Sequence, residues 1–138
     1  MAAKDRFHNA VKIAIEKDGW TITHDPLYID IEDVDFYVDL GAEKIIAAEK
    51  ASQKIAIEVK SFLGTSNVTD FHLALGQCLN YSSALELTDP ERILYLAVTS
   101  DVYDDFFQRR FIQRVIAKHQ LKLLIFNAQQ EEIVLWRN

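Results

Sequence analysis

Cysteine, glycine and proline are all scarce in this chain of 138 residues. Cys78 is the only cysteine, so no internal disulfide can form, and the cytoplasm is the expected compartment. The four glycines and two prolines favour regular elements joined by short connections. The sequence has no run of about 18 uncharged apolar residues, and its polar N-terminus is unlike a signal peptide. These absences favour one soluble domain over residues 1–138, with no membrane segment.

Basic residues are also in the minority, because 15 Lys and Arg stand against 21 Asp and Glu. The net charge of −6 disfavours indiscriminate coating of nucleic acid, which requires an excess of cations. A local basic patch is still compatible with this charge. Arg110, Arg114 and Lys118 form such a stripe at helical spacing and are the candidates for phosphate contacts. The solvated face of an ordinary amphipathic helix has the same pattern.

The hydrophobic pattern predicts helices and strands in alternation. Apolar residues recur at helical spacing over 5–18, about 68–87, and 101–118. Alternating or short apolar runs predict strands over 20–23, 27–31, 35–40, 44–50, 54–62, 92–99, 121–126 and 133–136. For this order of elements the natural packing is an α/β fold, in which helices flank both sides of a mixed central sheet.

The sharpest local signal is the pair Glu58 and Lys60 in the predicted strand 54–62. Residues two apart on a strand point to the same face, so the carboxylate and the ammonium lie side by side. Glu58 and the neighbouring backbone carbonyl of Val59 are hard oxygen ligands of the kind that Mg²⁺ (or Mn²⁺) prefers. Lys60 would orient an attacking water, help to deprotonate it, or offset charge on a phosphate. A surface ion pair is the competing interpretation.

A metal site needs a second carboxylate close to Glu58. The sequence predicts a hairpin that turns at residues 51–53, which would put Glu58 opposite Ile46. Asp39 is the better candidate for the first carboxylate because it lies near the end of a predicted strand, and Glu43 is the alternative. Two solvated turn carboxylates would produce the same spacing.

The helix predicted over 68–87 adds Gln77 and Tyr81, which share a face because they are four residues apart. Gln77 would bind a water or a phosphate oxygen, with Tyr81 as an accessory group, and Gly76 would let this helix approach the sheet closely. Alternatively, Gln77 caps a backbone group and Tyr81 belongs to the core. His8, on the first helix, is a further accessory candidate that would border the site or lie on a solvated face.

Taken together, Asp39, Glu58, Lys60 and Gln77 resemble the catalytic set of the PD-(D/E)xK nuclease superfamily. The element order over roughly the first hundred residues is similar to the restriction-endonuclease-like αβββαβ core of that superfamily, and helix 68–87 resembles the one in the RecB-like branch. The resemblance implies DNA as substrate and four catalytic residues. It makes Asp39, Glu58 and the Val59 carbonyl metal ligands, Lys60 the catalytic lysine and Gln77 an accessory. One departure is that the residue before Asp39 is not proline.

The chain is also similar to the XisH family, the fdxN-element excision controlling factors of cyanobacteria. The matching segments are 18–23, 39–43, 47–50, 55–62, 76–77 and 95–98. This resemblance implies a role in controlling the excision of a DNA element by a site-specific recombinase, alongside an XisI-like protein. A homodimer is left open.

Two classes of function fit these observations. The first is a Mg²⁺-dependent nuclease, which predicts that Asp39, Glu58, Lys60 and Gln77 converge on one site. The second is a catalytically inactive nuclease-fold regulator that binds protein partners or DNA without cleavage. A vestigial ion-pair network that only supports the fold is a third interpretation. The sequence therefore leaves enzymatic activity open.

Overall fold

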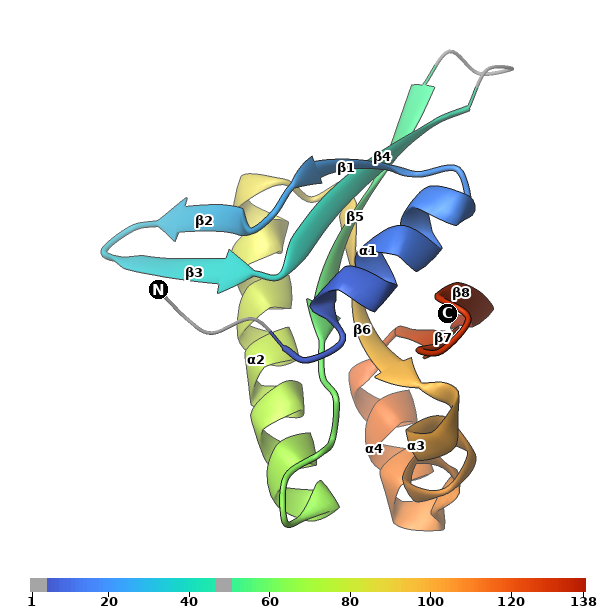
Figure 1. Cartoon of the computed structure of the whole chain (residues 1–138). Helices are drawn as coiled ribbons and strands as arrows, with labels where there is room; N and C mark the ends of the chain where they lie inside the picture. The colour runs from blue at the N-terminus through green and yellow to red at the C-terminus, as the bar shows by residue number, and fades with distance from the viewer. Residues whose placement is uncertain (1–4, 47–50) are drawn as a thin grey trace.

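The computed structural model describes residues 5–46 and 51–138 and contains a mixed six-stranded sheet with helices on both faces (Figure 1). The strand order is β1-β4-β5-β6-β7-β8, in which β5, β6 and β7 pair in parallel and the outer pairs are antiparallel. The elements along the chain are α1 (His8–Lys17), β1 (Thr21–His24), β2 (Leu27–Ile31), β3 (Val34–Val38), β4 (Leu40–Ile46), β5 (Ala51–Val59), α2 (Asn67–Thr88), β6 (Arg92–Thr99), α3 (Ser100–Asp104), η1 (Phe106–Gln108), α4 (Arg110–His119), β7 (Leu123–Asn127) and β8 (Glu132–Arg137).

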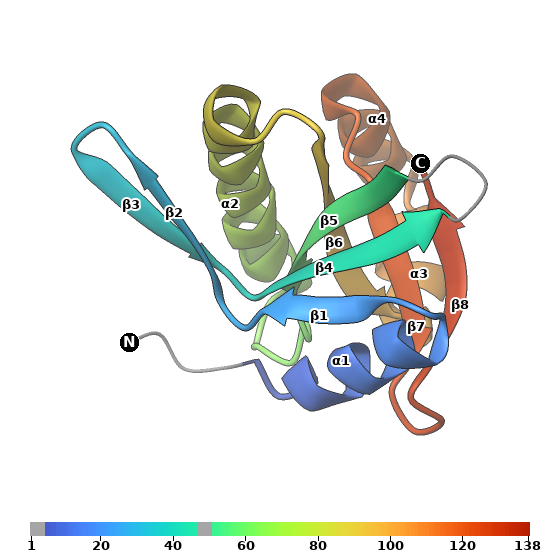
Figure 2. The same cartoon turned by 90° about the horizontal axis from the view of Figure 1, so that it is seen from above.

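Each face of the six-stranded sheet has its own apolar core. Val11 and Ile15 of α1 pack with Ile57 on one face, whereas Phe106 and Phe107 of η1 join α2 and α4 on the other. Figure 2 shows this separation, with α1 below the sheet and α2 and α4 above it. The predicted α/β architecture with a flanked mixed sheet is therefore confirmed.

β2 and β3 form a separate two-stranded sheet, which projects from the body of the molecule beside α2 (Figures 1 and 2). One face of this hairpin carries Leu27, Ile29 and Phe36, which pack in the core beneath α2. The other face exposes Tyr28 and Tyr37, whose rings stack with centroids 5.1 Å apart. The sequence predicted one continuous strand over 35–40. This prediction is wrong, because the chain bends at Asp39, which separates β3 from β4.

The predicted hairpin register is also wrong. Residues 52 and 53, expected in the turn, belong to β5, where they pair with Ile45 and Lys44 of β4. Residues 47–50, which the sequence analysis assigned to a strand, lie outside the described residues. The observed register pairs Leu40 with Ile57. Glu58 therefore lies beside Asp39 and not opposite Ile46. The apolar and small residues at 45–48 are the reason why the sequence predicted a strand over 44–50.

The helix predicted over 101–118 is broken into α3, η1 and α4. Asp105 (φ −109°, ψ −83°) and Arg109 (φ −64°, ψ 139°) both leave helical geometry. These breaks let the consecutive side chains of Phe106 and Phe107 both enter the core, where they are 1% and 0% exposed. Helical spacing over 101–118 would place Phe111 on the apolar face of a continuous helix, but it is 72% exposed. Core packing of aromatic rings has thus overridden helical periodicity.

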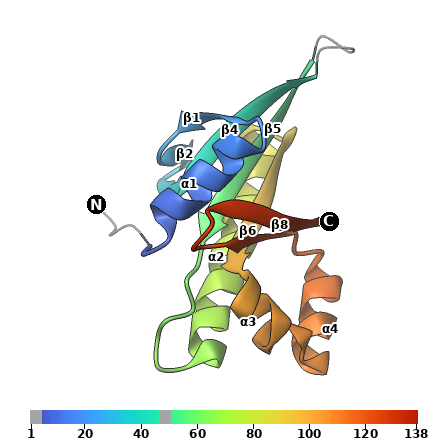
Figure 3. The ribbon, with the colours of Figure 1, turned by 45° about the vertical axis from the view of Figure 1, so that its right-hand side comes forward.

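Figure 3 shows α1 beside β8, the last strand of the sheet, with α3 and α4 below them. No helix within residues 5–46 and 51–138 is sufficiently long and apolar to cross a membrane.

Candidate functional site

Asp39 lies where the chain leaves the projecting hairpin and enters the six-stranded sheet. The pairing of Leu40 with Ile57 brings it beside Glu58 at the end of β5. The backbone N–H of Asp39 donates to Glu58 Oε1 (3.2 Å), and the N–H of Val59 donates to Asp39 Oδ2 (2.7 Å). These reciprocal hydrogen bonds hold the two carboxyl groups next to each other, and together they are called the carboxylate pair below.

The carboxylate pair is largely shielded from water, and its affinity for protons is therefore high. Glu58 is only 5% exposed. Burial, followed by the charge of Asp39, raises the pKa of Glu58 to about 8, although the Asp39 N–H and the charge of Lys60 oppose the shift. Burial also raises the pKa of Asp39, against the Val59 N–H and the nearby His8. At neutral pH one proton therefore stays bound to the pair.

Lys60 and the Val59 carbonyl border the carboxylate pair at the end of β5. Ile57 and Val59 belong to the core under α1, so the alternating side chains of Glu58 and Lys60 face the α2 side. The N–H of Lys60 donates to Ala97 of β6 (3.1 Å). Backbone groups alternate in direction along a strand, so the Val59 N–H and carbonyl point the other way, toward Asp39. Lys60 thus lies on the same strand face as Glu58, and the Val59 carbonyl lies on the side of Asp39.

One turn of α2 lies against the carboxylate pair. The Oε1 atom of Gln77 is buried and has no hydrogen-bond partner among the described residues. Burial and then the charges of Glu58 and Asp39 raise the pKa of the Tyr81 hydroxyl, which therefore stays neutral and able to donate a hydrogen bond. Burial likewise raises the pKa of Cys78 to about 12, so this thiol is neither a nucleophile nor a ligand at neutral pH.

His8 lies close enough to Asp39 for its charge to lower the pKa of that carboxyl group. It is 3% exposed, its Nε2 lies 2.7 Å from Asp25 Oδ1, and its Nδ1 is buried without a partner in the described chain. Lys12 Nζ donates to the other oxygen, Asp25 Oδ2 (2.8 Å). Burial opposes ionisation of Asp25, but the hydrogen bonds from Lys12 and His8 outweigh it and lower the pKa of Asp25. His8 is thus held in a fixed orientation at the border of the site.

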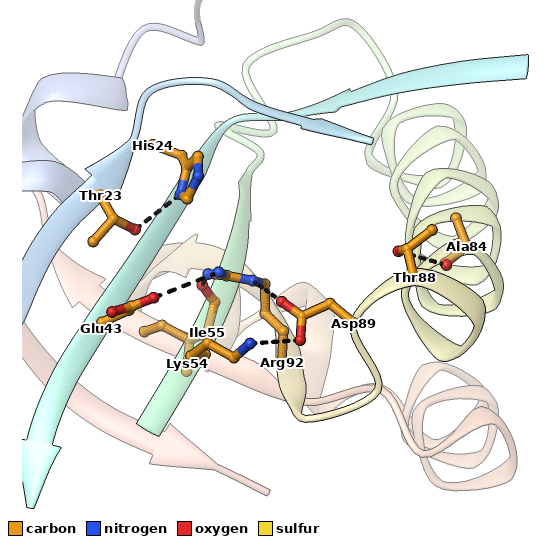
Figure 4. Close-up of polar contacts among 9 residues, drawn as sticks. All are labelled: Thr23, His24, Glu43, Lys54, Ile55, Ala84, Thr88, Asp89 and Arg92. Atoms are coloured by element: carbon orange, nitrogen blue, oxygen red, sulfur yellow. Dashed lines mark hydrogen bonds and ion pairs between the residues drawn. The ribbon is translucent and has the colours of Figure 1, made fainter. Parts of the chain in front are cut away.

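Glu43, the alternative first carboxylate, is placed elsewhere. It pairs with Lys54 in the sheet and faces the buried guanidinium of Arg92, with Arg92 Nη2 at 3.9 Å from Glu43 Oε1. Figure 4 shows the surrounding network, in which Arg92 Nε donates to Asp89 Oδ2 (3.1 Å) and Lys54 Nζ donates to Asp89 Oδ1 (2.6 Å). The backbone carbonyl of Ile55 accepts from Arg92 Nη1 (2.9 Å). Glu43 therefore belongs to a structural ion-pair cluster and not to the carboxylate pair.

The basic stripe is exposed on α4, as the sequence predicted for Arg110, Arg114 and Lys118. In the part of the chain that the structure describes, no hydrogen bond or ion pair joins these residues to the carboxylate pair.

Two features of the site were missed or misread in the sequence. Asp25 was not among the predicted site residues, because nothing local in the sequence signals that it reaches His8, 17 residues away. Gly76 was expected to bring α2 close to the sheet, but a Cβ atom added there would meet nothing within 4 Å. Gly76 is exposed, so close packing does not explain it.

The arrangement can bind a small hard cation or hold a proton. Its oxygen donors are the carboxylate pair and the Val59 carbonyl, and a neutral amide, a phenol and an ammonium surround them. Within residues 5–46 and 51–138 no three His, Cys, Asp or Glu side chains converge as a metal-ligand group. A cation here would thus be held by two carboxylates, a carbonyl and water, the type of shell usual for Mg²⁺.

Comparison with known proteins identifies the family. The family model described as XisH protein matches residues 1–134. The chain is similar to a crystal structure of an XisH family protein from Nostoc punctiforme PCC 73102, with 49% sequence identity and a TM-score of 0.89. The match covers 97% of this chain and 100% of that one. No match was found among curated proteins.

A second crystal structure is that of an fdxN element excision controlling factor protein from Anabaena variabilis. It is 45% identical, with a TM-score of 0.89 and coverage of 98% of this chain and 100% of that one. Both comparisons extend over nearly the whole length, and they agree with the segments that resemble the family in the sequence. The chain therefore belongs to the XisH family.

Proposed function

We propose that the chain has a restriction-endonuclease-like fold and carries a divalent-metal phosphodiesterase site of the PD-(D/E)xK type. The observation that supports this most directly is the carboxylate pair, with its reciprocal hydrogen bonds at 3.2 Å and 2.7 Å. Two acidic groups with raised pKa values are unfavourable neighbours unless a proton or a cation lies between them. A cation that replaces the bound proton would stabilise both carboxylates in their ionised form.

The residues present fit Mg²⁺ or Mn²⁺. Asp39, Glu58 and the Val59 carbonyl would hold the ion through hard oxygen atoms. When bound, such an ion polarises a phosphodiester and stabilises the negative charge that develops during its hydrolysis. Binding also requires Glu58 to release its proton, so affinity for the ion rises with pH across the pKa of about 8.

The neighbouring side chains supply what the carboxylate pair lacks. Lys60, on the same strand face as Glu58, places a positive charge where a phosphate group would lie, and orients the attacking water. The unpartnered Oε1 of Gln77 accepts a hydrogen bond from that water, and the neutral Tyr81 hydroxyl donates one to a phosphate oxygen. His8, held by Asp25, lies near enough to Asp39 for its charge to favour the ionised carboxylate.

At the level of the cell, we propose that the protein acts in the control of excision of a DNA element by a recombinase. Its relative from Anabaena variabilis is described as an fdxN element excision controlling factor. An XisI-like protein is the expected companion in this role.

A regulatory function through a protein partner is a second candidate, and a specific observation favours it. The segment 18–43 contains eight Asp and Glu and neither Lys nor Arg, so the rest of the chain has a net charge of +2. Much of this acidic charge lies on the projecting β2–β3 hairpin, which repels DNA but suits a basic protein surface. An XisI-like partner or the recombinase would be held there.

Nicking of supercoiled plasmid DNA tests the proposed function. The wild type should convert the plasmid to open circles in Mg²⁺ or Mn²⁺ but not in EDTA. Asp39→Asn and Glu58→Gln should abolish nicking, Lys60→Met should slow it strongly, and the matched control Glu43→Gln should retain it. If the wild type neither binds metal nor cleaves DNA, the proposed nuclease function is wrong and the regulatory function is favoured.

A further inference from the structure

Both tryptophans of the chain lie in one pocket, far along β5 from the carboxylate pair. Trp20 precedes β1 and Trp136 lies on β8, and their ring centroids are 5.9 Å apart. Tyr95 of β6 meets Trp136 edge to face with centroids 4.9 Å apart. The hollow that these three rings line has a volume of about 620 Å³. It opens on the α1 side of the sheet, opposite the side that Glu58 faces.

Packing accounts for only part of this cluster. Tyr95 is 7% exposed and its hydroxyl is hydrogen-bonded to Asn138, so it is an ordinary core residue with a satisfied polar end. Trp20 and Trp136 are only partly buried, and each contributes a wall of the hollow. The partly exposed indole rings and the half-exposed Ile93, which also lines the hollow, form a surface on which a planar ligand can stack.

The polar groups at the rim have balanced charges. Lys44 lies over the Trp20 ring at 5.6 Å and donates to the backbone oxygen of Asp18 (2.8 Å), and Lys54 is paired with Asp89. Neither lysine is therefore a free counter-charge for a phosphate. The side chains of Ser52 and Gln53, also at the rim, carry donors and acceptors that can pair with the edge of a heterocycle.

We propose that this pocket binds an unpaired nucleobase of single-stranded nucleic acid by stacking. The choice of nucleic acid as the ligand rests on the proposed function, because phosphodiester cleavage requires such a substrate. Stacking on aromatic side chains tolerates any base, since every base has a π-face. Because the lysines are already paired, binding should depend only weakly on salt, unlike binding that neutralises phosphates.

Intrinsic fluorescence tests the proposal, since the two reporters are the walls of the pocket. The probe is a thymidine oligonucleotide of about eight nucleotides, added to the metal-free wild type in EDTA so that cleavage cannot occur. We expect saturable quenching that changes little with salt. Trp20→Leu and Trp136→Leu each retain one reporter, and each should weaken binding by about tenfold or more. Using both variants keeps the test valid if one of them fails to fold.

The control is Tyr37→Leu, which removes an exposed aromatic ring on the β2–β3 hairpin outside the pocket and should leave the affinity unchanged. Absence of quenching, or affinity that falls steeply with salt, would overturn the proposal. So would stronger quenching by a phenylalanine dipeptide than by the oligonucleotide, which would assign the pocket to a protein partner.

The outcomes also separate this inference from the proposed function. Quenching that persists in Glu58→Gln, together with loss of metal-dependent nicking in that variant, supports both. Nicking without quenching overturns the base pocket alone, and quenching without any nicking overturns the phosphodiesterase alone.

Discussion

Replacing Glu58 with glutamine should change how the stability of the metal-free protein depends on pH. Glutamine keeps an oxygen that accepts from the Asp39 N–H, a hydrogen bond of 3.2 Å in the wild type. It also has an N–H₂ group, which can donate to the Asp39 carboxylate without carrying a charge. The variant is therefore equivalent to the wild type with its shared proton permanently in place.

The size of the effect follows from the pKa of Glu58, which is about 8 in the folded protein and 4.5 ordinarily. The folded state binds the proton more tightly than the unfolded state. The stability that Glu58 contributes is therefore complete below about pH 4.5 and is lost as the pH rises through about 8. Between about pH 6 and pH 9 this loss amounts to about 3 kcal/mol, or roughly 10 °C in Tm for a chain of this length.

Thermal unfolding in EDTA, followed by circular dichroism from about pH 6 to pH 9, measures the effect. The wild type should lose about 3 kcal/mol more than Glu58→Gln over this range. The control Glu86→Gln, which replaces an exposed carboxylate on α2, should parallel the wild type. If Glu58→Gln and the wild type lose stability in parallel, the carboxylate pair does not share a proton and the reasoning is refuted.

Three further predictions test other parts of the account. Lys60→Met should lower the rate of DNA nicking by about 10²–10³-fold while Mg²⁺ binding, measured by calorimetry, persists; equal loss of both would contradict the assigned role. Asp25→Asn should lower the free energy of unfolding by about 1–3 kcal/mol near neutral pH, since it weakens the contacts of His8 and Lys12. Because the pKa of Asp25 is lowered, this difference should vanish as the pH falls through that pKa, and a difference that grows in acid would be inconsistent. Phe107→Ala should cost about 3–5 kcal/mol in urea unfolding, and a cost below about 1 kcal/mol would show that the aromatic core is not tightly packed.

Local chemistry was predictable from the sequence wherever one strand or one helix determines it. Glu58 and Lys60 share a face because strand periodicity alone requires it, and Gln77 and Tyr81 share a helix face for the same kind of reason. The strands Leu27–Ile31 and Arg92–Thr99 were predicted with their observed limits. These segments have strong apolar patterns bounded by turns, so local preference and tertiary packing agree.

Pairing between segments was harder to predict. The choice between Asp39 and Glu43 depends on the β4–β5 register, and the expected turn at 51–53 placed Glu58 opposite the wrong residue. Small and apolar residues on both sides of the turn make several registers similar in local pattern, and only the packed sheet distinguishes them. The contact between His8 and Asp25 was invisible for a related reason, since tertiary structure alone joins α1 to the β1–β2 turn.

The most direct test of the central claim is calorimetric titration of Mg²⁺ and Mn²⁺ into the wild type near pH 7, in two buffers with different ionisation enthalpies. The account predicts binding with release of close to one proton per ion, because the ion replaces the proton shared by Asp39 and Glu58. Glu43→Gln should bind like the wild type, and Glu58→Gln should not bind. Equal binding by Glu58→Gln, or no binding by the wild type at any pH up to about 9, would contradict a divalent-cation site at the carboxylate pair.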